Sequence, residues 1–321
     1  MKRLLIAAAV ILLASPIAHS DIDETRTTLR QHILTLINRD RALYHLPPVE
    51  LDLELSSLGD EYCAKQIRYG TNGHYTVDGQ PPYMRYSLAG FNDGLSENAA
   101  AWSANYSFSD RALYEMARRS EDAMMAEMPP NDGHRKTLLD PHATHVGIGV
   151  SWHGGEFRLV QEFVRRYVDW TRPLPRHANV GETVTLAGRP LSGMQIEAIS
   201  VHYEKAPEAM PAHVANAFES YSLPDNRKDY LPRLKQDYRL NQNGTIEITR
   251  REYADGRRGD FYVGKSGDFS FQVPFTEGAG VYTVVVWVTR KGHTTQIAAS
   301  NISIRVAEPA PGSVRASALS R

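Results

Sequence analysis

Four short segments in the first half of the chain hold polar side chains that can do chemistry. They are Gly73-His74-Tyr75, Ser96-Glu97-Asn98, Met124-Met125-Ala126-Glu127 and Gly133-His134-Arg135. Two imidazoles and two carboxylates can bind a divalent cation if the fold brings them together. The same groups can instead form an acid/base pair, and spacing alone does not decide between the two. The chain contains no His-Glu-x-x-His and no Gly-x-Ser-x-Gly, so a zinc-peptidase helix and a nucleophile elbow are both excluded.

The elements that must position these residues follow from the hydrophobic periodicity. Apolar residues at three- and four-residue spacing predict a helix over about 24–44, a second from an N-cap at Asp52 to Gly70, and a third over about 109–128. Residues 70–96 are rich in Gly, Pro, Asn and Asp, which predicts mostly loop around His74. Two alternating runs, 146–152 and 156–166, flank His153-Gly154-Gly155 and predict a hairpin. Residues 21–170 are therefore expected to form an α+β domain.

From residue 179 onward the helical pattern disappears. Short alternating runs separated by turn residues predict strands at 183–186, 195–203, 245–250, 269–273, 282–289 and 297–306. Evenly spaced short strands are typical of an immunoglobulin-like or fibronectin-like β-sandwich, here over 179–307. We expect a linker at 171–178, an irregular Pro-rich insertion at 206–237 and a disordered tail at 308–321.

The N-terminus predicts export. Met1-Lys2-Arg3 precedes an apolar run from Leu4 to Ala14 and small residues at Ala18 and Ser20, the pattern of a cleaved signal peptide over 1–20. The run is shorter than the ~20 apolar residues of a spanning helix, so no transmembrane anchor is expected after cleavage. We expect a secreted or periplasmic protein.

The composition excludes further classes of protein. A formal net charge of -1 over 321 residues argues against binding nucleic acid by general attraction. The single cysteine, Cys63, excludes an intramolecular disulfide, so packing must stabilise the chain. An exported protein with one cysteine suits a bacterial envelope. Cys63 lies on the apolar face of the second predicted helix, where we expect a small buried hydrophobe.

The order of these motifs resembles the CAP superfamily, which comprises cysteine-rich secretory proteins, antigen 5 and pathogenesis-related proteins and is also called the SCP domain. Its bacterial branch is the most similar. The resemblance covers residues 27–165. It is carried by Leu36-Ile37-Asn38-Arg39, His74, Arg85, Glu97-Asn98-Ala99-Ala100, Gly133-His134-Arg135, Val146-Gly147-Ile148-Gly149-Val150 and Val160-Gln161-Glu162-Phe163.

The resemblance implies a three-layer α-β-α sandwich with a surface cleft. In that family two histidines and two glutamates line the cleft, and some members hold zinc or another divalent cation there. The histidines correspond to His74 and His134 and the first glutamate to Glu97. The second glutamate corresponds to Glu127, with Glu121 as the competing assignment. Arg85, Asn98 and Arg135 are expected to support the cleft.

A shared fold does not decide the activity. The sequence favours an exported, non-enzymatic binding module whose His/Glu cleft holds a divalent metal or a small ligand. The alternatives are a metal-assisted, peptidase-like hydrolase using the same cleft, and a lipid- or sterol-binding protein. The expected partner is a protein, a lipid or a ligand of the cell envelope, and the β-sandwich is expected to serve as a spacer or a second recognition surface.

Overall fold

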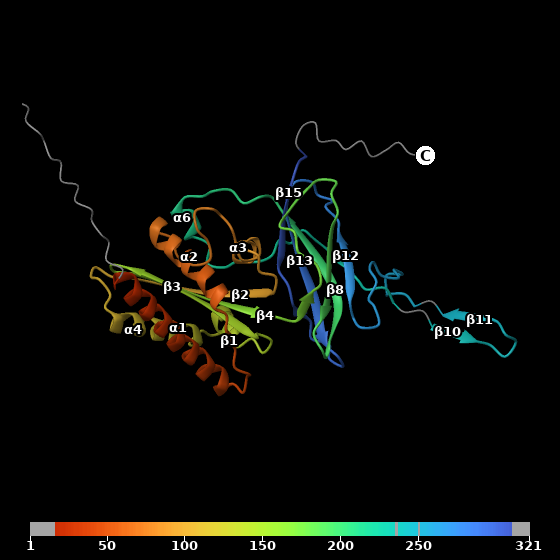
Figure 1. Ribbon diagram of the computed structural model, residues 1–321, viewed down its shortest axis with the longest axis horizontal. Coiled ribbons are helices and arrows are strands. Elements are labelled where there is room, and N and C mark those ends of the chain that lie inside the picture. Colours follow the sequence, from red (N-terminus) through yellow and green to blue (C-terminus); the bar gives the residue numbers. More distant parts are fainter. Residues whose placement is uncertain (1–16, 235–236, 250, 310–321) are drawn as a thin grey trace, which may run out of the picture.

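The computed structural model describes residues 17–234, 237–249 and 251–309. A mixed helix-and-strand part and a mainly stranded part lie side by side (Figure 1). Residues 1–16 of the predicted signal peptide and 310–321 of the predicted tail lie outside the described residues. Residues 17–20 begin helix α1 (Ile17–Leu43), which starts earlier than the predicted residue 24. Among the described helices, none has the length and apolar character needed to cross a membrane.

A four-stranded sheet forms the middle layer of the N-terminal part. Its order is β1 (Glu50–Leu51), β3 (His145–His153), β4 (Glu156–Arg165) and β2 (Gly94–Ser103), with β1 parallel to β3 and the other pairs antiparallel. The β3–β4 hairpin is confirmed. The expectation of loop up to residue 96 is wrong at its end, because β2 begins at Gly94. The polar run Ser96-Glu97-Asn98 interrupts the apolar alternation by which a strand is detected.

Helices cover both faces of this sheet (Figure 1). Helix α2 (Leu53–Tyr69) packs on one face, and α1 and α4 (Asp110–Met125) pack on the other. The predicted ends of α2 are confirmed, since the Asp52 side chain accepts from the Leu55 N–H and Gly70 ends the helix at φ 66°. Helices α3 (Pro82–Leu88) and α5 (Gly133–Leu138) are short. Helix α3 lies inside the segment predicted to be mostly loop. Pro82, in the first turn, favours the start of this helix.

The N-terminal core has apolar clusters on both faces of the sheet. The largest one joins α1 and α4 to β3 and β4 through Leu29, Ile33, Ile37, Leu113, Met116, Val146, Ile148, Val150, Phe157, Leu159 and Phe163. On the other face Cys63 packs with Tyr62 and Val160 and is 0% exposed, as predicted for a small buried hydrophobe. Both faces of β4 are therefore buried.

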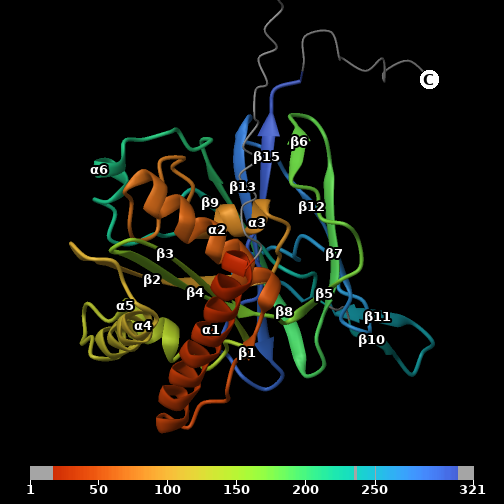
Figure 2. The ribbon, with the colours of Figure 1, turned by 60° about the vertical axis from the view of Figure 1, so that its left-hand side comes forward.

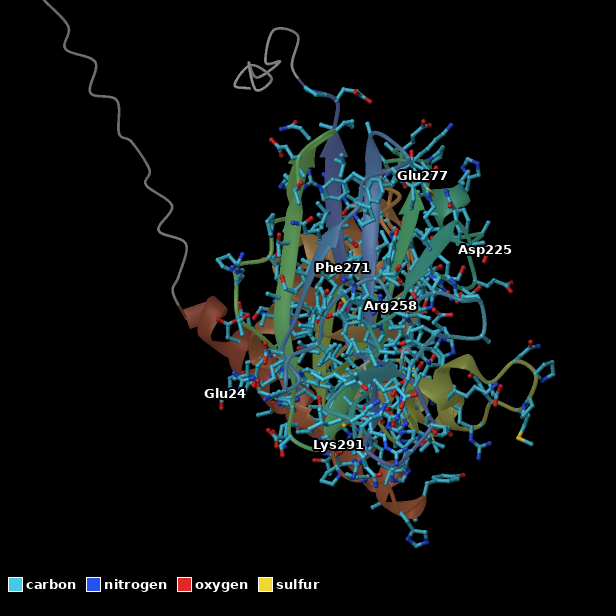
Figure 3. The ribbon with its side chains drawn as sticks, turned by 90° about the vertical axis from the view of Figure 1, so that its right-hand side faces the viewer. Glu24, Asp225, Arg258, Phe271, Glu277 and Lys291 are labelled. Atoms are coloured by element: carbon cyan, nitrogen blue, oxygen red, sulfur yellow. The ribbon has the colours of Figure 1, made fainter. Side chains whose placement is uncertain are left out.

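Two sheets form most of the C-terminal part. One has the order β12 (Phe269–Val273), β7 (Val184–Pro190), β5 (Val168–Trp170). The other has the order β6 (His177–Asn179), β15 (Ile302–Ala307), β13 (Gly280–Arg290), β8 (Met194–Glu204), β9 (Arg227–Tyr230), with β14 (Ile297–Ala298) paired to β13. One apolar cluster spans both sheets and includes buried Phe271 (Figure 3). Strand β5 lies before the predicted linker yet pairs with β7.

Two segments leave these sheets. Strands β10 (Asp237–Leu240) and β11 (Ile246–Thr249) form a two-stranded hairpin that projects away from the body (Figure 1). Residues 205–226, between β8 and β9, hold the short helix α6 (Ala212–Ala215) and correspond to most of the predicted irregular insertion. Helix α6 lies near α2 of the N-terminal part in both views (Figures 1 and 2).

The two parts are joined by a close interface in which α3 packs beside β15 (Figure 2). The Asn301 side chain accepts from the Leu95 N–H at 2.7 Å, and Ser87 Oγ accepts from the Ser303 N–H at 2.7 Å. At Gly94 the backbones approach so closely that a Cβ would overlap the Ala298 carbonyl oxygen. Glycine is therefore required at that position for the two parts to dock.

Candidate ligand-binding cleft

A cavity of about 710 Å³ lies where β2, the α4–α5 connection and the C-terminal part meet. This volume falls in the range of small-molecule sites, roughly 300–1,000 Å³. All four predicted cleft residues line it: His74, Glu97, Glu127 and His134. The structure thus brings together side chains from four separate segments of the sequence.

The first pair is His74 and Glu97. The His74 Nδ1 atom lies 2.9 Å from Glu97 Oε1, and the two residues are 6% and 3% exposed. Glu97 also forms an ion pair with Arg85, so Glu97 is the acceptor and His74 Nδ1 carries the hydrogen. Burial, together with the Arg85 charge, lowers the pKa of His74 to about 4. His74 is therefore neutral at pH 7, and its Nε2 carries a lone pair.

The second pair is His134 and Glu127. His134 Nδ1 lies 2.5 Å from Glu127 Oε1, while Glu127 Oε2 accepts from the His134 N–H at 2.9 Å. Glu127 thereby holds both the ring and the start of α5. The competing residue, Glu121, does not contact His134. It is 0% exposed and accepts from Gln161 Nε2 at 2.8 Å, and burial raises its pKa to about 8.

The two pairs face each other across a short distance. The ring centres of His74 and His134 are 6.3 Å apart, with an angle of 23° between the ring planes. In the part of the chain that the structure describes, no three His, Cys, Asp or Glu side chains are placed to hold a metal ion together. Protein metal sites usually use three or four side-chain ligands, and here each carboxylate is engaged by its own histidine. These residues alone do not make a complete metal centre, and a divalent ion stays a prediction.

Arg85 supports the first pair from behind. Its guanidinium lies 3.5 Å from the centre of the Tyr62 ring and donates to the His74 carbonyl at 3.1 Å. It also lies 3.9 Å from Glu162 Oε1. Arg85 therefore connects two buried carboxylates and one loop, a role that a planar, permanently charged group fills well.

Asn98 and Arg135 support the second pair. Asn98 Nδ2 donates to the His134 carbonyl at 3.1 Å and to Gln161 Oε1 at 3.2 Å. Arg135 donates to the Glu127 carbonyl at 3.2 Å and to the Tyr44 hydroxyl at 2.7 Å. Asn98 lines the cavity and Arg135 does not. Asn98 therefore holds α5 to strand β2, and Arg135 holds it to Glu127 after α4 and to Tyr44 after α1.

Sequence reasoning missed two groups of residues. Glu162 is fully buried behind Arg85, and burial raises its pKa to about 7. Its place in the run Val160-Gln161-Glu162-Phe163 is the only signal that could have singled it out. Glu219, Tyr221 and Leu223 line the cavity from the C-terminal part. No local pattern marks them, because their contacts depend on how the two parts dock.

Comparison with known proteins identifies the N-terminal part. Residues 34–163 match the family model CAP, described as the Cysteine-rich secretory protein family. A crystal structure of an extracellular protein containing a SCP domain from Bacillus anthracis is 18% identical, with a TM-score of 0.34. That match covers 44% of this chain and 41% of the other. No curated protein matches the sequence significantly. The chain therefore contains a CAP domain, at residues 34–163.

Proposed function

We propose that this CAP-domain protein is an exported, non-enzymatic binding module that holds a small ligand in the cleft between its two His–Glu pairs. The observation that carries the proposal is that His74 and His134, each fixed by a carboxylate, line one cavity of about 710 Å³. Side chains held in this way have little orientational entropy left to lose, which favours binding. Export rests on the basic and apolar N-terminal pattern.

The surroundings of Ser96, which lines the cavity, do not favour a serine-type hydrolase. Ser96 Oγ accepts from Arg165 Nη1 at 3.0 Å, and no histidine of the described residues contacts it. An activated nucleophile needs a base within hydrogen-bond reach. A lipid or sterol is the less favoured ligand, because three carboxylates line this cavity beside its apolar surface, and a wholly apolar ligand would offer them no hydrogen-bond donor. We further propose that the C-terminal part is an immunoglobulin-like or fibronectin-like β-sandwich.

The test is ligand-observed NMR with a library of amine, alcohol and carboxylate fragments. The wild type is compared with the double variant His74→Ala/His134→Ala and with His293→Ala, which removes an exposed histidine that does not line the cavity. We expect fragments that bind the wild type and His293→Ala but not the double variant. Equal binding to all three proteins, or no binding at all, contradicts the proposal.

Two further measurements address the predicted alternatives. Zinc content by mass spectrometry, equal in the wild type and the double variant, counts against a metal bound by these histidines. Turnover of peptides or esters by the zinc-loaded wild type, lost in the double variant, replaces the binding proposal with the hydrolase. Lipid recovered by solvent extraction from the wild type but not the double variant replaces it with the lipid binder.

A further inference from the structure

Residues 205–226, which we call the cleft strap, cross from the C-terminal sheet onto the CAP domain. The Met210 N–H donates to the Val77 carbonyl at 2.8 Å. Asn216 accepts from the Asn72 N–H at 2.8 Å and donates to the Gly70 carbonyl at 3.0 Å. These bonds tie the strap to the end of α2 and to the loop that carries His74.

The CAP domain is shaped to receive the strap. Gly79 has φ +71°, and a Cβ there would overlap the Glu208 carbonyl oxygen. Only glycine allows both that backbone conformation and that approach. The rings of Phe218 and Tyr75 also pack with their centres 4.8 Å apart. The strap therefore occupies a fitted place, and its far end at Asp225 returns to the exposed surface beside β9 (Figure 3).

Tyr221 places the strap directly on the first His–Glu pair. Its ring centre lies 4.8 Å from that of His74, edge to face. Its hydroxyl oxygen accepts from the Glu97 N–H at 2.6 Å. Tyr221 thus covers one side of His74 and fixes the strand backbone that carries Glu97.

The charges around the cavity are unbalanced. Besides Glu97, whose charge is offset by Arg85, the carboxylates of Glu127 and Glu219 line it, whereas Arg165, the lining guanidinium among the described residues, pairs with Asp140 at 2.8 Å. Arg165 also donates to Ser96 Oγ and to the carbonyls of Leu95 and Ala298. Negative charge therefore exceeds the positive charge that is available to a ligand.

Hydrogen-bond acceptors are in excess as well. Asn98 lines the cavity and is 1% exposed, and its Oδ1 has no hydrogen-bond partner within the described part of the chain. A buried carbonyl oxygen without a donor is costly, so a ligand that brings N–H groups is favoured. Tyr83, Leu95 and Leu223 add apolar surface to the same cavity.

We propose that the cleft strap is the specificity-determining wall of the cleft, where Glu219 selects small ligands with an ammonium or guanidinium group on an apolar body. Tyr221 is the positioning residue that seats the strap on His74 and Glu97. This inference rests on the proposed function and adds the ligand class to it. The CAP domain supplies the two His–Glu pairs, and the C-terminal part supplies the selectivity.

Three probes of similar shape test the charge preference: 2-phenylethylamine, 2-phenylethanol and 3-phenylpropionate. In the full-length wild type we expect the amine to bind more tightly than the alcohol, and the alcohol more tightly than the carboxylate. Glu219→Gln should weaken the affinity for the amine by about twofold to fivefold, as expected for the loss of one exposed charge. The affinity for the alcohol should not change. Glu208→Gln, which removes a strap carboxylate that does not line the cavity, should change neither.

The outcomes separate this inference from the proposed function. Equal affinities for amine and alcohol, or equal effects of Glu219→Gln and Glu208→Gln, overturn the charge preference. If the alcohol still binds the wild type and is lost in His74→Ala/His134→Ala, the binding function stands without the preference. If none of the three probes binds the wild type, both fail.

The positioning role of Tyr221 is tested separately, by NMR of His74. Tyr221→Ala should shift the His74 Hε1 resonance, because the ring current of the neighbouring phenol is lost. Tyr221→Phe keeps the ring and should restore most of that shift. An unchanged His74 resonance in a folded Tyr221→Ala variant contradicts the positioning role.

Discussion

Glu97 of β2 and Glu162 of β4 lie directly opposite each other in the antiparallel sheet. Like charges in this position destabilise a sheet. Here the Arg85 guanidinium pairs with Glu97 and lies 3.9 Å from Glu162 Oε1. Burial still raises the pKa of Glu162 to about 7, because Arg85 offsets only part of the desolvation. The stability of the cleft therefore depends on one cation shared by two carboxylates.

Arg85→Ala should destabilise the protein strongly. It leaves Glu97 and Glu162 buried without their cation, a change that typically costs about 3–5 kcal/mol. The measurement is the free energy of unfolding from urea titration at pH 7. The matched control is Arg118→Ala on the exposed face of α4, where the ion pairs of Arg118 with Glu115 and Asp122 should contribute less than about 1 kcal/mol. Similar losses in the two variants contradict this account of the buried network.

Glu121 should make the protein less stable as the pH rises from about 4.5 to 8. Burial, with the nearby Asp40 charge, raises its pKa in the folded state to about 8. Between its ordinary pKa and 8 the folded state holds the proton more tightly, so stability falls with rising pH and the loss is complete above 8. Glu121→Gln should remove this slope and stabilise the protein at pH 9, by roughly 2–5 kcal/mol. Urea titrations at pH 5, 7 and 9 check both points, and an unchanged slope would falsify the assignment to Glu121.

His74 should remain neutral from pH 8 down to about 5. Its pKa is lowered to about 4 by burial and by Arg85, whereas the unfolded chain takes up the proton near pH 6.5. His74 therefore contributes no pH dependence above 6.5, and stability is lost as the pH falls from 6.5 towards 4. An NMR titration of the histidine Hε1 resonances follows this directly. A midpoint for His74 near 6.5 contradicts its buried setting.

Gly94→Ala should disturb the interface between the two parts. The added Cβ would overlap the Ala298 carbonyl oxygen, so the backbone must move at a cost of about 1–3 kcal/mol. Gly133→Ala is the control, because nothing lies within 4 Å of a Cβ there and its φ is not positive. We expect that change to stay within about 0.5 kcal/mol. Equal thermal midpoints for the two variants contradict the close approach.

Cys63 should not react with thiol reagents in the folded protein. It is 0% exposed, and burial raises the pKa of its thiol far above the usual value. Incubation with 5,5′-dithiobis(2-nitrobenzoate) at pH 8 should release no detectable thionitrobenzoate until urea is added. Rapid reaction under native conditions means that α2 opens or that the thiol is accessible.

Short-range sequence patterns predicted the elements that depend on interactions between residues close together in the chain. The Asp52 cap, the Gly70 terminus and the β3–β4 hairpin depend on residues only a few positions apart, and the structure has all three. The start of strand β2 was not predicted, because the polar residues Ser96, Glu97 and Asn98 that line the cleft break the alternation of apolar and polar residues. Its role in the site and its irregular pattern have the same cause.

The deeper parts of the site could not be predicted from spacing. Glu162 lies on β4, which is buried on both faces, so no alternation shows which side its carboxylate takes. Tyr221 contacts Glu97 across 124 positions of sequence, and that contact exists only because the two parts dock. The choice of Glu127 over Glu121 required the turn before α5, which brings Glu127 within 2.5 Å of His134.

Both ends of the cleft strap are held by neighbouring strands of one sheet, where His202 of β8 pairs with Arg227 of β9. A loop anchored in this way can lengthen, shorten or change its residues without shifting either strand. The surface that faces His74 is therefore open to evolutionary diversification, much as a hypervariable loop is on a constant scaffold. Related chains could keep both His–Glu pairs unchanged and still acquire cleft walls of different shape.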